Sequence, residues 1–139
     1  MKRCAFCAIV DGSDADVVHR DDRVIAFLDH APLLKGHVLV APVDHVETFD
    51  DLPRELIEPL FEVVQRVSRA FPKVLGSDGS FTSINTRVSQ SVPHAHVHVV
   101  PRRRGDGLFR AGIVWVRQRY AADEAAQLAA RLREAIAAS

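Results

Sequence analysis

Three histidines at alternate positions constrain this chain more than any other feature. The run 93–101 places His94, His96 and His98 two residues apart, with only alanine or valine between them. Small and β-branched residues favour an extended strand, and a strand sends alternate side chains to opposite faces. The three imidazoles should therefore line one face, while the intervening apolar side chains pack on the other. Three titratable rings in strict alternation have no packing advantage over leucine, so the pattern predicts a functional site.

Length and charge bound the classes of protein to which the chain can belong. Its 139 residues suit one ordinary domain, and we expect a single domain over 1–139. The 18 basic and 18 acidic residues cancel, so no strong global field points to a nucleic acid polymer or a membrane surface. No apolar stretch approaches the roughly 20 residues that cross a bilayer. The apolar run near the start ends at Asp11 without a cleavage site, and we expect a cytoplasmic protein.

The pattern of apolar residues and turn formers predicts an α+β fold. A long helix should begin at a cap formed by Asp50 or Asp51 and continue to Phe71, with a kink or a short first helix at Pro59. A C-terminal helix should cover 122–138, and 113–116 should be a short extended piece. Neighbouring strands with segregated helices indicate a mainly antiparallel five-stranded sheet. The strands are expected at 17–20, 24–28, 37–41, 80–85 and 93–101.

Alternating histidines serve two chemistries. They can chelate a hydrolytic metal ion, or one of them can attack phosphorus as a nucleophile while its neighbours hold the phosphate. The preceding segment carries Asn85, Gln90 and Ser91, whose amides and hydroxyl suit phosphate oxygens, and no carboxylate occurs from residue 80 to residue 101. These surroundings favour the nucleophile, with metal-dependent hydrolysis as the alternative.

Two cysteines, Cys4 and Cys7, form a Cys-x-x-Cys pair near the start of the chain. A disulfide between them would close a very small loop and add little stability. A thioredoxin-like redox pair normally follows a strand, and nothing before Cys4 supplies one. The pair therefore indicates half of a tetrahedral metal site, whose other two ligands lie elsewhere.

At this point the chain resembles the histidine triad (HIT) family of nucleotide hydrolases and transferases. Residues 94–100 match the family signature His-φ-His-φ-His-φ-φ, in which φ is apolar. Gln90-Ser91-Val92 and Asn85 match positions ahead of the triad, although the turn 86–89 is shorter than in the family and has no glycine. Further matches lie in Phe27-Leu28-Asp29, Pro32, Gly36-His37, Pro42 and His45.

The resemblance implies a fold, an activity and a set of site residues. It implies a HIT-like fold, a homodimer, and cleavage of a purine nucleotide at the α-phosphorus with His96 as the nucleophile. Candidate substrates are nucleoside phosphoramidates, dinucleoside polyphosphates and adenylyl adducts. The other residues implied are His98, Gln90 and Ser91 at the phosphate, Asn85 also at the phosphate, Asp29 for the ribose hydroxyls, and Phe6, Ile9 and Phe27, which would sandwich the base.

The resemblance also completes the metal site. In similar bacterial proteins the Cys-x-x-Cys pair binds zinc together with two histidines, and the matching residues here are His45 and His94. The implied set is Cys4, Cys7, His45 and His94, a closed Cys₂His₂ site in which zinc would be structural. The alternative is a pair of reduced cysteines without metal.

Several residues keep plainer interpretations. His19, His30 and His37 are isolated in the sequence, and we expect solvated or hydrogen-bonded structural roles for them. Trp115 lies either near a partner subunit's site or in a buried anchor. A further alternative for the whole protein is a nucleotide-binding or protein-interaction module with little turnover.

Overall fold

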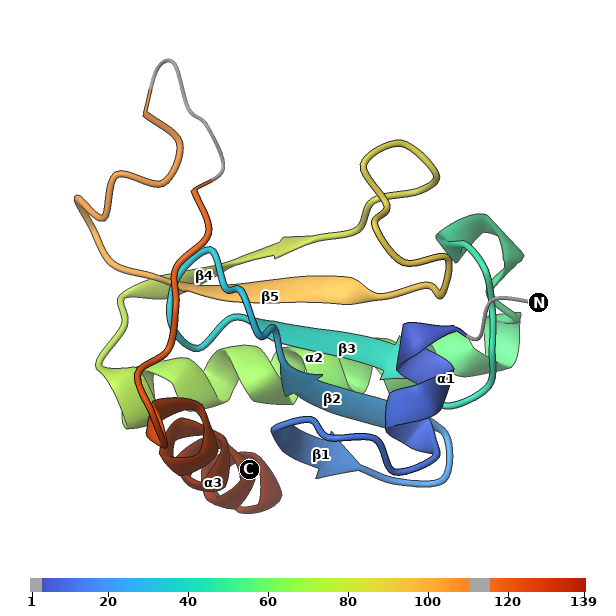
Figure 1. Cartoon of the computed structure of the whole chain (residues 1–139), viewed down its shortest axis with the longest axis horizontal. Coiled ribbons are helices and arrows are strands. Elements are labelled where there is room, and N and C mark those ends of the chain that lie inside the picture. Colours follow the sequence, from blue (N-terminus) through green and yellow to red (C-terminus); the bar gives the residue numbers. More distant parts are fainter. Residues whose placement is uncertain (1–3, 111–115) are drawn as a thin grey trace.

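The protein is built on one five-stranded antiparallel sheet, seen in a computed structural model that describes residues 4–110 and 116–139 (Figure 1). The strand order is β1-β2-β3-β5-β4, and every neighbouring pair is antiparallel. The predicted α+β architecture is confirmed. The strands are β1 (Val17–Arg20), β2 (Val24–Leu28), β3 (Val38–Pro42), β4 (Gly79–Ser83) and β5 (Val97–Arg102).

Two helices, α2 (Arg54–Leu75) and α3 (Glu124–Ala137), cover one face of the sheet (Figure 1). The main hydrophobic core lies between this face and the helices, where burial of apolar side chains supplies most of the folding free energy. The apolar stripe predicted for the long helix is confirmed by its buried residues. These are Leu60, Val63, Val64, Val67, Ala70 and Phe71.

The start of α2 differs from the prediction. Asp50 and Asp51 belong to a separate 3₁₀ turn (Phe49–Asp51), and α2 begins after Pro53 with no side-chain cap. The helix also continues through Pro59 as one element, so the predicted short first helix is wrong. Pro59 lies close to the start of α2, where a missing N–H removes one early backbone bond, and the buried stripe beyond it holds the helix together.

The opposite face of the sheet carries a much smaller cover. The six-residue helix α1 (Ala5–Val10), which was not predicted from the sequence, packs there through Phe6. Its partners are Ile25, Phe27, Leu39 and Ala41, which form a second, smaller apolar cluster. Because α1 covers only part of this face, the rest remains available for a cavity.

The histidine run is only partly a strand. β5 begins at Val97, so His94 and His96 lie in the irregular segment that precedes it. A backbone bond from the Ala95 N–H to the Val46 carbonyl (2.7 Å) replaces the sheet pairing at this point. The alternation still holds from Val97 onward, because Val97 belongs to the main core and His98 faces the other way, into the cavity described below.

Two further predictions concern the C-terminal part of the chain. The extended piece predicted for 113–116, with Trp115, falls almost entirely outside the described residues. Within the described ranges, none of the helices combines the length and the apolar character that a bilayer crossing requires.

Candidate active site and metal centre

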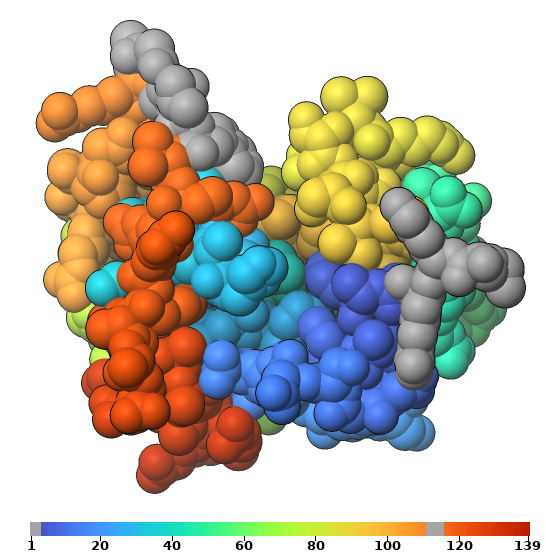
Figure 2. All heavy atoms as spheres, viewed as in Figure 1, coloured from blue at the N-terminus to red at the C-terminus, as the bar shows by residue number. Residues whose placement is uncertain are grey.

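A cavity of about 920 Å³ opens on the α1 face of the sheet. It is walled by α1, the loop that follows β2, the segment before β5 and the segment after residue 115, which appear in blue, cyan, yellow and orange in Figure 2. The residues predicted for the site that line it are Phe6, Ile9, Phe27, Asp29, Ser91, His96 and His98.

His96 is buried, and its hydrogen-bond partner fixes the tautomer of its ring. Its Nδ1 lies 2.7 Å from the backbone carbonyl oxygen of His94. A carbonyl oxygen can only accept, so Nδ1 must carry the proton and donate it. Burial lowers the pKa of His96 below its usual value, which keeps the ring neutral near pH 7. A neutral ring protonated on Nδ1 has a lone pair on Nε2, the nitrogen needed for nucleophilic attack.

His98 belongs to a chain of hydrogen bonds that also includes His37. The Leu33 N–H donates to His37 Nδ1 (3.1 Å), so His37 must carry its proton on Nε2 and donate it to His98 Nδ1 (3.0 Å). His98 is then protonated on Nε2. Burial lowers the pKa of His37 to about 3 and that of His98 to about 4, so both rings are neutral. His98 thus offers a donor, where His96 offers a lone pair.

His37 had no predicted role beyond a structural one. In the structure His37 is fully buried, and its hydrogen bond fixes the tautomer of the His98 ring. The two residues are 61 positions apart, and they become neighbours only because β3 pairs with β5. The spacing of the two residues in the sequence does not reveal this contact. A correct prediction that β3 pairs with β5 would have revealed it.

Gln90 and Asn85 do not reach the cavity. The Gln90 amide accepts from the Arg87 N–H (2.9 Å) and donates to the carbonyl oxygens of Glu47 and Val92. Asn85 donates to the carbonyl oxygen of Ser89 (3.3 Å). Both amides therefore hold the loop that presents Ser91, and their predicted contacts with phosphate stay a prediction.

The backbone of the turn 86–89 requires support from its neighbours. Arg87 and Ser89 have φ angles of 66° and 63°, the left-handed region that glycine adopts at least cost. Side chains other than glycine in this region are held there by surrounding contacts. The contacts of Gln90 and Asn85 with the loop backbone supply that support.

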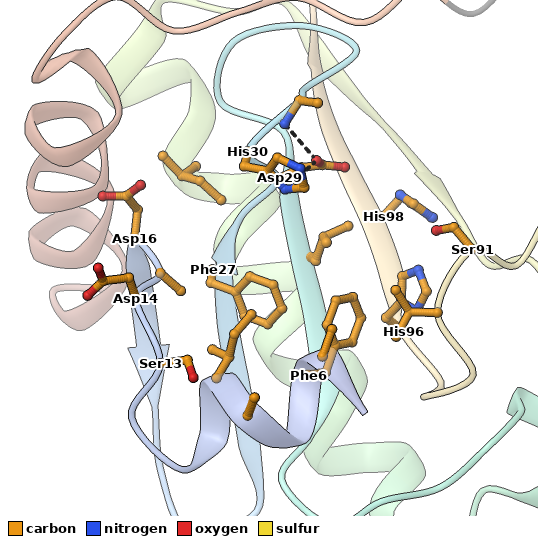
Figure 3. Close-up of a pocket in the computed structure, with 18 of the residues that line it drawn as sticks. Phe6, Ser13, Asp14, Asp16, Phe27, Asp29, His30, Ser91, His96 and His98 are labelled. Carbon is orange, nitrogen blue, oxygen red and sulfur yellow. Dashed lines mark hydrogen bonds and ion pairs between the residues drawn. The ribbon is translucent and has the colours of Figure 1, made fainter. Parts of the chain in front are cut away.

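The apolar part of the cavity lies between its two polar ends. Phe6 and Phe27 occupy the middle of the view in Figure 3. His96 and His98 lie to their right, and Asp29 and His30 lie above them. The ring centroids of Phe6 and Phe27 are 5.1 Å apart in an edge-to-face contact, so no base can enter between them. The predicted sandwich is wrong for this pair. The two rings form one wall instead, and Ile9 lines the cavity beside them.

Asp29, the predicted ribose acceptor, accepts hydrogen bonds through both of its carboxylate oxygens. Its Oδ1 accepts from the Ala31 N–H (3.0 Å), and its Oδ2 accepts from Arg117 Nη1 (2.8 Å). Arg117 also lines the cavity, and the sequence analysis did not single it out. It lies 88 residues from Asp29, within an arginine-rich segment that offers no motif to distinguish it.

The four predicted zinc ligands come together, and none of them lines the open cavity. Cys4, Cys7, His45 and His94 each present a ligand atom within 4.8 Å of the others. Cys4 Sγ lies 3.4 Å from His94 Nδ1, Cys7 Sγ lies 3.3 Å from His45 Nδ1, and the two Nδ1 atoms are 3.3 Å apart. These spacings agree with the edges of about 3.3–3.6 Å expected for tetrahedral zinc with sulfur and nitrogen ligands.

The environment of His94 suits a metal ligand. Its Nε2 lies 2.8 Å from the Pro42 carbonyl oxygen, which requires a proton on Nε2 and leaves a lone pair on Nδ1, the atom facing the cysteines. Burial lowers the pKa of His94, which favours the neutral ring that metals bind. The residues present therefore fit a closed Cys₂His₂ site.

A second group of possible ligands fits a metal poorly. Asp29, His37 and His98 also lie within 4.8 Å of one another. However, both nitrogens of His37 are used in hydrogen bonds, and the Asp29 carboxylate accepts from Arg117. The group is therefore better described as a hydrogen-bonded network.

Comparison with known proteins agrees with this geometry. The family model for the HIT domain matches residues 11–105. The chain belongs to the histidine triad family. It is 42% identical over 107 residues to an uncharacterised HIT-like protein of Methanocaldococcus jannaschii, covering 75% of this chain and 82% of that one. A solved HIT neighbour, a zinc-bound histidine triad family protein from Mycobacterium smegmatis, is 36% identical with a TM-score of 0.83, covering 97% and 94% of the two chains.

Two HIT relatives carry activities in their names. An adenylylsulfatase from Arabidopsis thaliana is 31% identical over 76% of this chain and 55% of its own length. An asymmetrical bis(5'-nucleosyl)-tetraphosphatase from Schizosaccharomyces pombe is 36% identical over 66% of this chain and 52% of its own length. Both names describe nucleotide hydrolases, so the family supports nucleotide hydrolysis in general without selecting one substrate.

Proposed function

We propose that this protein cleaves a nucleotide at its α-phosphorus through a covalent nucleotidyl-histidine intermediate on His96. The observation that carries the proposal is the 2.7 Å bond between His96 Nδ1 and the His94 carbonyl oxygen, which leaves the lone pair on Nε2 of a ring lining the cavity. A buried, neutral, correctly oriented imidazole is the form that attacks phosphorus near pH 7.

The first step makes one bond and breaks one. His96 Nε2 donates its electron pair to the α-phosphorus, and the bond from phosphorus to the leaving group breaks, with its electrons going to that group. The ring becomes positively charged because Nδ1 keeps its proton, and the His94 carbonyl oxygen stabilises this charge. His98, protonated on Nε2, donates to a phosphate or bridging oxygen, and the Ser91 hydroxyl assists from the cavity rim.

In the second step water or another acceptor attacks the same phosphorus. The bond between phosphorus and Nε2 breaks, its electrons return to the ring, and the water's proton leaves to solvent. The product is a nucleoside monophosphate. Asp29 would accept the ribose hydroxyls through its remaining lone pairs, and the wall of Phe6, Phe27 and Ile9 would contact the base.

We further propose that Zn²⁺ binds Cys4, Cys7, His45 and His94. A closed set of four ligands leaves no open position, so the ion would stabilise the fold and supply no nucleophile. In this arrangement the ligand side chain of His94 is held in place, and its backbone carbonyl in turn orients His96. The homodimer and the cytoplasmic location predicted from the sequence remain predictions, the former tested by sedimentation of the purified protein.

A nucleotide-binding module with little turnover is a second candidate. It is favoured by the amides of Gln90 and Asn85, which bind the loop backbone and leave the phosphate with fewer ligands. On the first proposal these two residues act by holding Ser91 in place, while their direct contact with phosphate stays a prediction.

The stereochemical course at phosphorus tests the proposal. A panel of phosphoramidates, dinucleoside polyphosphates and adenylyl adducts, each chiral at the α-phosphorus, would be offered to the protein. Two successive in-line displacements give net retention of configuration, whereas a single attack by metal-bound water gives inversion. We expect retention. Inversion would favour metal-dependent hydrolysis, and an absence of turnover across the panel would favour the binding module.

A further inference from the structure

The charges around the cavity are unfavourable for a nucleotide, with one exception. Among the described lining residues there are three carboxylates, those of Asp14, Asp16 and Asp29, and a single lysine or arginine, which is Arg117. His98 is neutral, because burial lowers its pKa to about 4. A nucleoside monophosphate carries up to two negative charges near neutral pH. The attraction for its phosphate must therefore come chiefly from Arg117.

The guanidinium of Arg117 has donors to spare. Its Nη1 donates to Asp29 Oδ2 and to the Ala31 carbonyl oxygen, both at 2.8 Å. Within residues 4–110 and 116–139, no hydrogen-bond partner is recorded for Nη2 or Nε. A guanidinium has five N–H donors in a planar fork that matches phosphate geometry. The side chain is 42% exposed, so the remaining donors are accessible to a ligand in the cavity.

The backbone around Arg117 is fastened on its C-terminal side. The Gln118 N–H donates to the Pro32 carbonyl oxygen (2.6 Å), and the Tyr120 hydroxyl oxygen accepts from the Gly36 N–H (3.0 Å). Both contacts join the segment to the loop that carries Asp29. Arg117 is therefore positioned at the cavity by its own chain, whereas Arg119, two residues later and also exposed, does not line the cavity.

We propose that Arg117 is a phosphate-binding residue of the nucleotide site, an inference that rests on the proposed function. When a nucleotide binds, Arg117 donates to a phosphate oxygen while Asp29 accepts the ribose hydroxyls. Arg117 and Asp29 thereby contact the phosphate and the ribose of the same ligand. Arg117 makes the site selective for a charged nucleotide over the uncharged nucleoside.

Binding of AMP and of adenosine to three variants tests this role. Arg117→Gln removes the charge, Arg117→Lys keeps it without the fork, and Arg119→Gln is a matched control with the same charge change in the same segment. Calorimetry at low salt should show AMP binding about tenfold weaker or more in Arg117→Gln, the usual size for a lost charge-assisted hydrogen bond. Adenosine binding should stay within about twofold, since no phosphate is involved. Arg117→Lys should recover part of the loss, and Arg119→Gln should match the unmodified protein.

The other outcomes overturn the inference in distinguishable ways. Equal weakening of AMP and adenosine binding in both Arg117 variants would mean that the residue only holds the Asp29 loop. Unchanged AMP binding would mean that the phosphate lies out of its reach. If the unmodified protein bound neither AMP nor adenosine, the proposed function itself would fail, and the inference with it.

Discussion

Two neighbouring histidines, His94 and His96, differ in the surroundings of the ring nitrogen that does not bind a backbone carbonyl oxygen. Each donates one N–H to a backbone carbonyl oxygen, His94 to Pro42 and His96 to His94. The free nitrogen of His94 then faces two cysteine sulfurs, whereas His96 lines an open cavity. Both rings are buried and both have a lowered pKa. The group that faces the remaining lone pair, and not burial or the direction of the pKa shift, therefore distinguishes the candidate zinc ligand from the candidate nucleophile.

Substitution of the cavity histidine should produce the largest effect. His96→Ala removes the attacking nitrogen, and we expect turnover to fall by a factor of about a thousand or more, as when other covalent nucleophiles are removed. The four candidate zinc ligands are unchanged in this variant, so zinc content measured by atomic emission should stay near that of the unmodified protein. Loss of metal in this variant would break the distinction between the two histidines.

Substitution at the metal centre should act mainly on stability. Cys4→Ser removes one of four ligands, and we expect zinc content and thermal stability to fall together. A loss of roughly 3 kcal/mol would lower the melting temperature by about 10 °C in a domain of this size. Scanning calorimetry with and without a chelator measures both parts. Unchanged metal content and an unchanged melting temperature would remove the argument for structural zinc.

A smaller effect should appear in the pH dependence of stability. The pKa of His37 falls from 6.5 to about 3 on folding, chiefly by burial, with Asp29 opposing and His98, Arg117 and His96 adding to the fall. Between these pH values the unfolded chain binds a proton that the folded chain does not, so stability decreases as pH falls through this window.

His37→Gln should therefore flatten the curve. The unfolding free energy of the variant, measured by urea titration at constant zinc between pH 6 and pH 4, should depend on pH less steeply by roughly 1 kcal/mol per unit. His30→Gln is the matched control, because the His30 side chain is fully exposed, and its curve should follow that of the unmodified protein. Parallel curves for His37→Gln and the unmodified protein would contradict a lowered pKa of His37 in the folded protein.

The sequence predicted the site best where local pattern decides position. The alternation of the histidines placed His96 and His98 on one face, and the Cys-x-x-Cys spacing, with the family resemblance, brought Cys4 and Cys7 to His45 and His94. The apolar stripe of α2 and the two N-terminal strands likewise followed from periodicity.

The remaining features depend on contacts between distant parts of the chain. His37 gains its role through the pairing of β3 with β5, and Arg117 through a segment that returns to Asp29 over 88 residues. Gln90 binds the backbone of the turn at Arg87, where Arg87 and Ser89 have left-handed φ angles, a demand of local backbone geometry. None of these has a signature in residue spacing.

A covalent bond between His96 and phosphorus can be detected by mass spectrometry of turnover samples quenched with denaturant at alkaline pH, where a phosphorus–nitrogen bond of this kind survives. A substrate that reacts within milliseconds should leave the intact protein heavier by one nucleotidyl group, and mild digestion at neutral pH should place that mass on His96. The same adduct should be missing from His96→Ala and present in Cys4→Ser protein that remains folded. Full-speed cleavage with no nucleotide on the protein at any quench time would contradict the account.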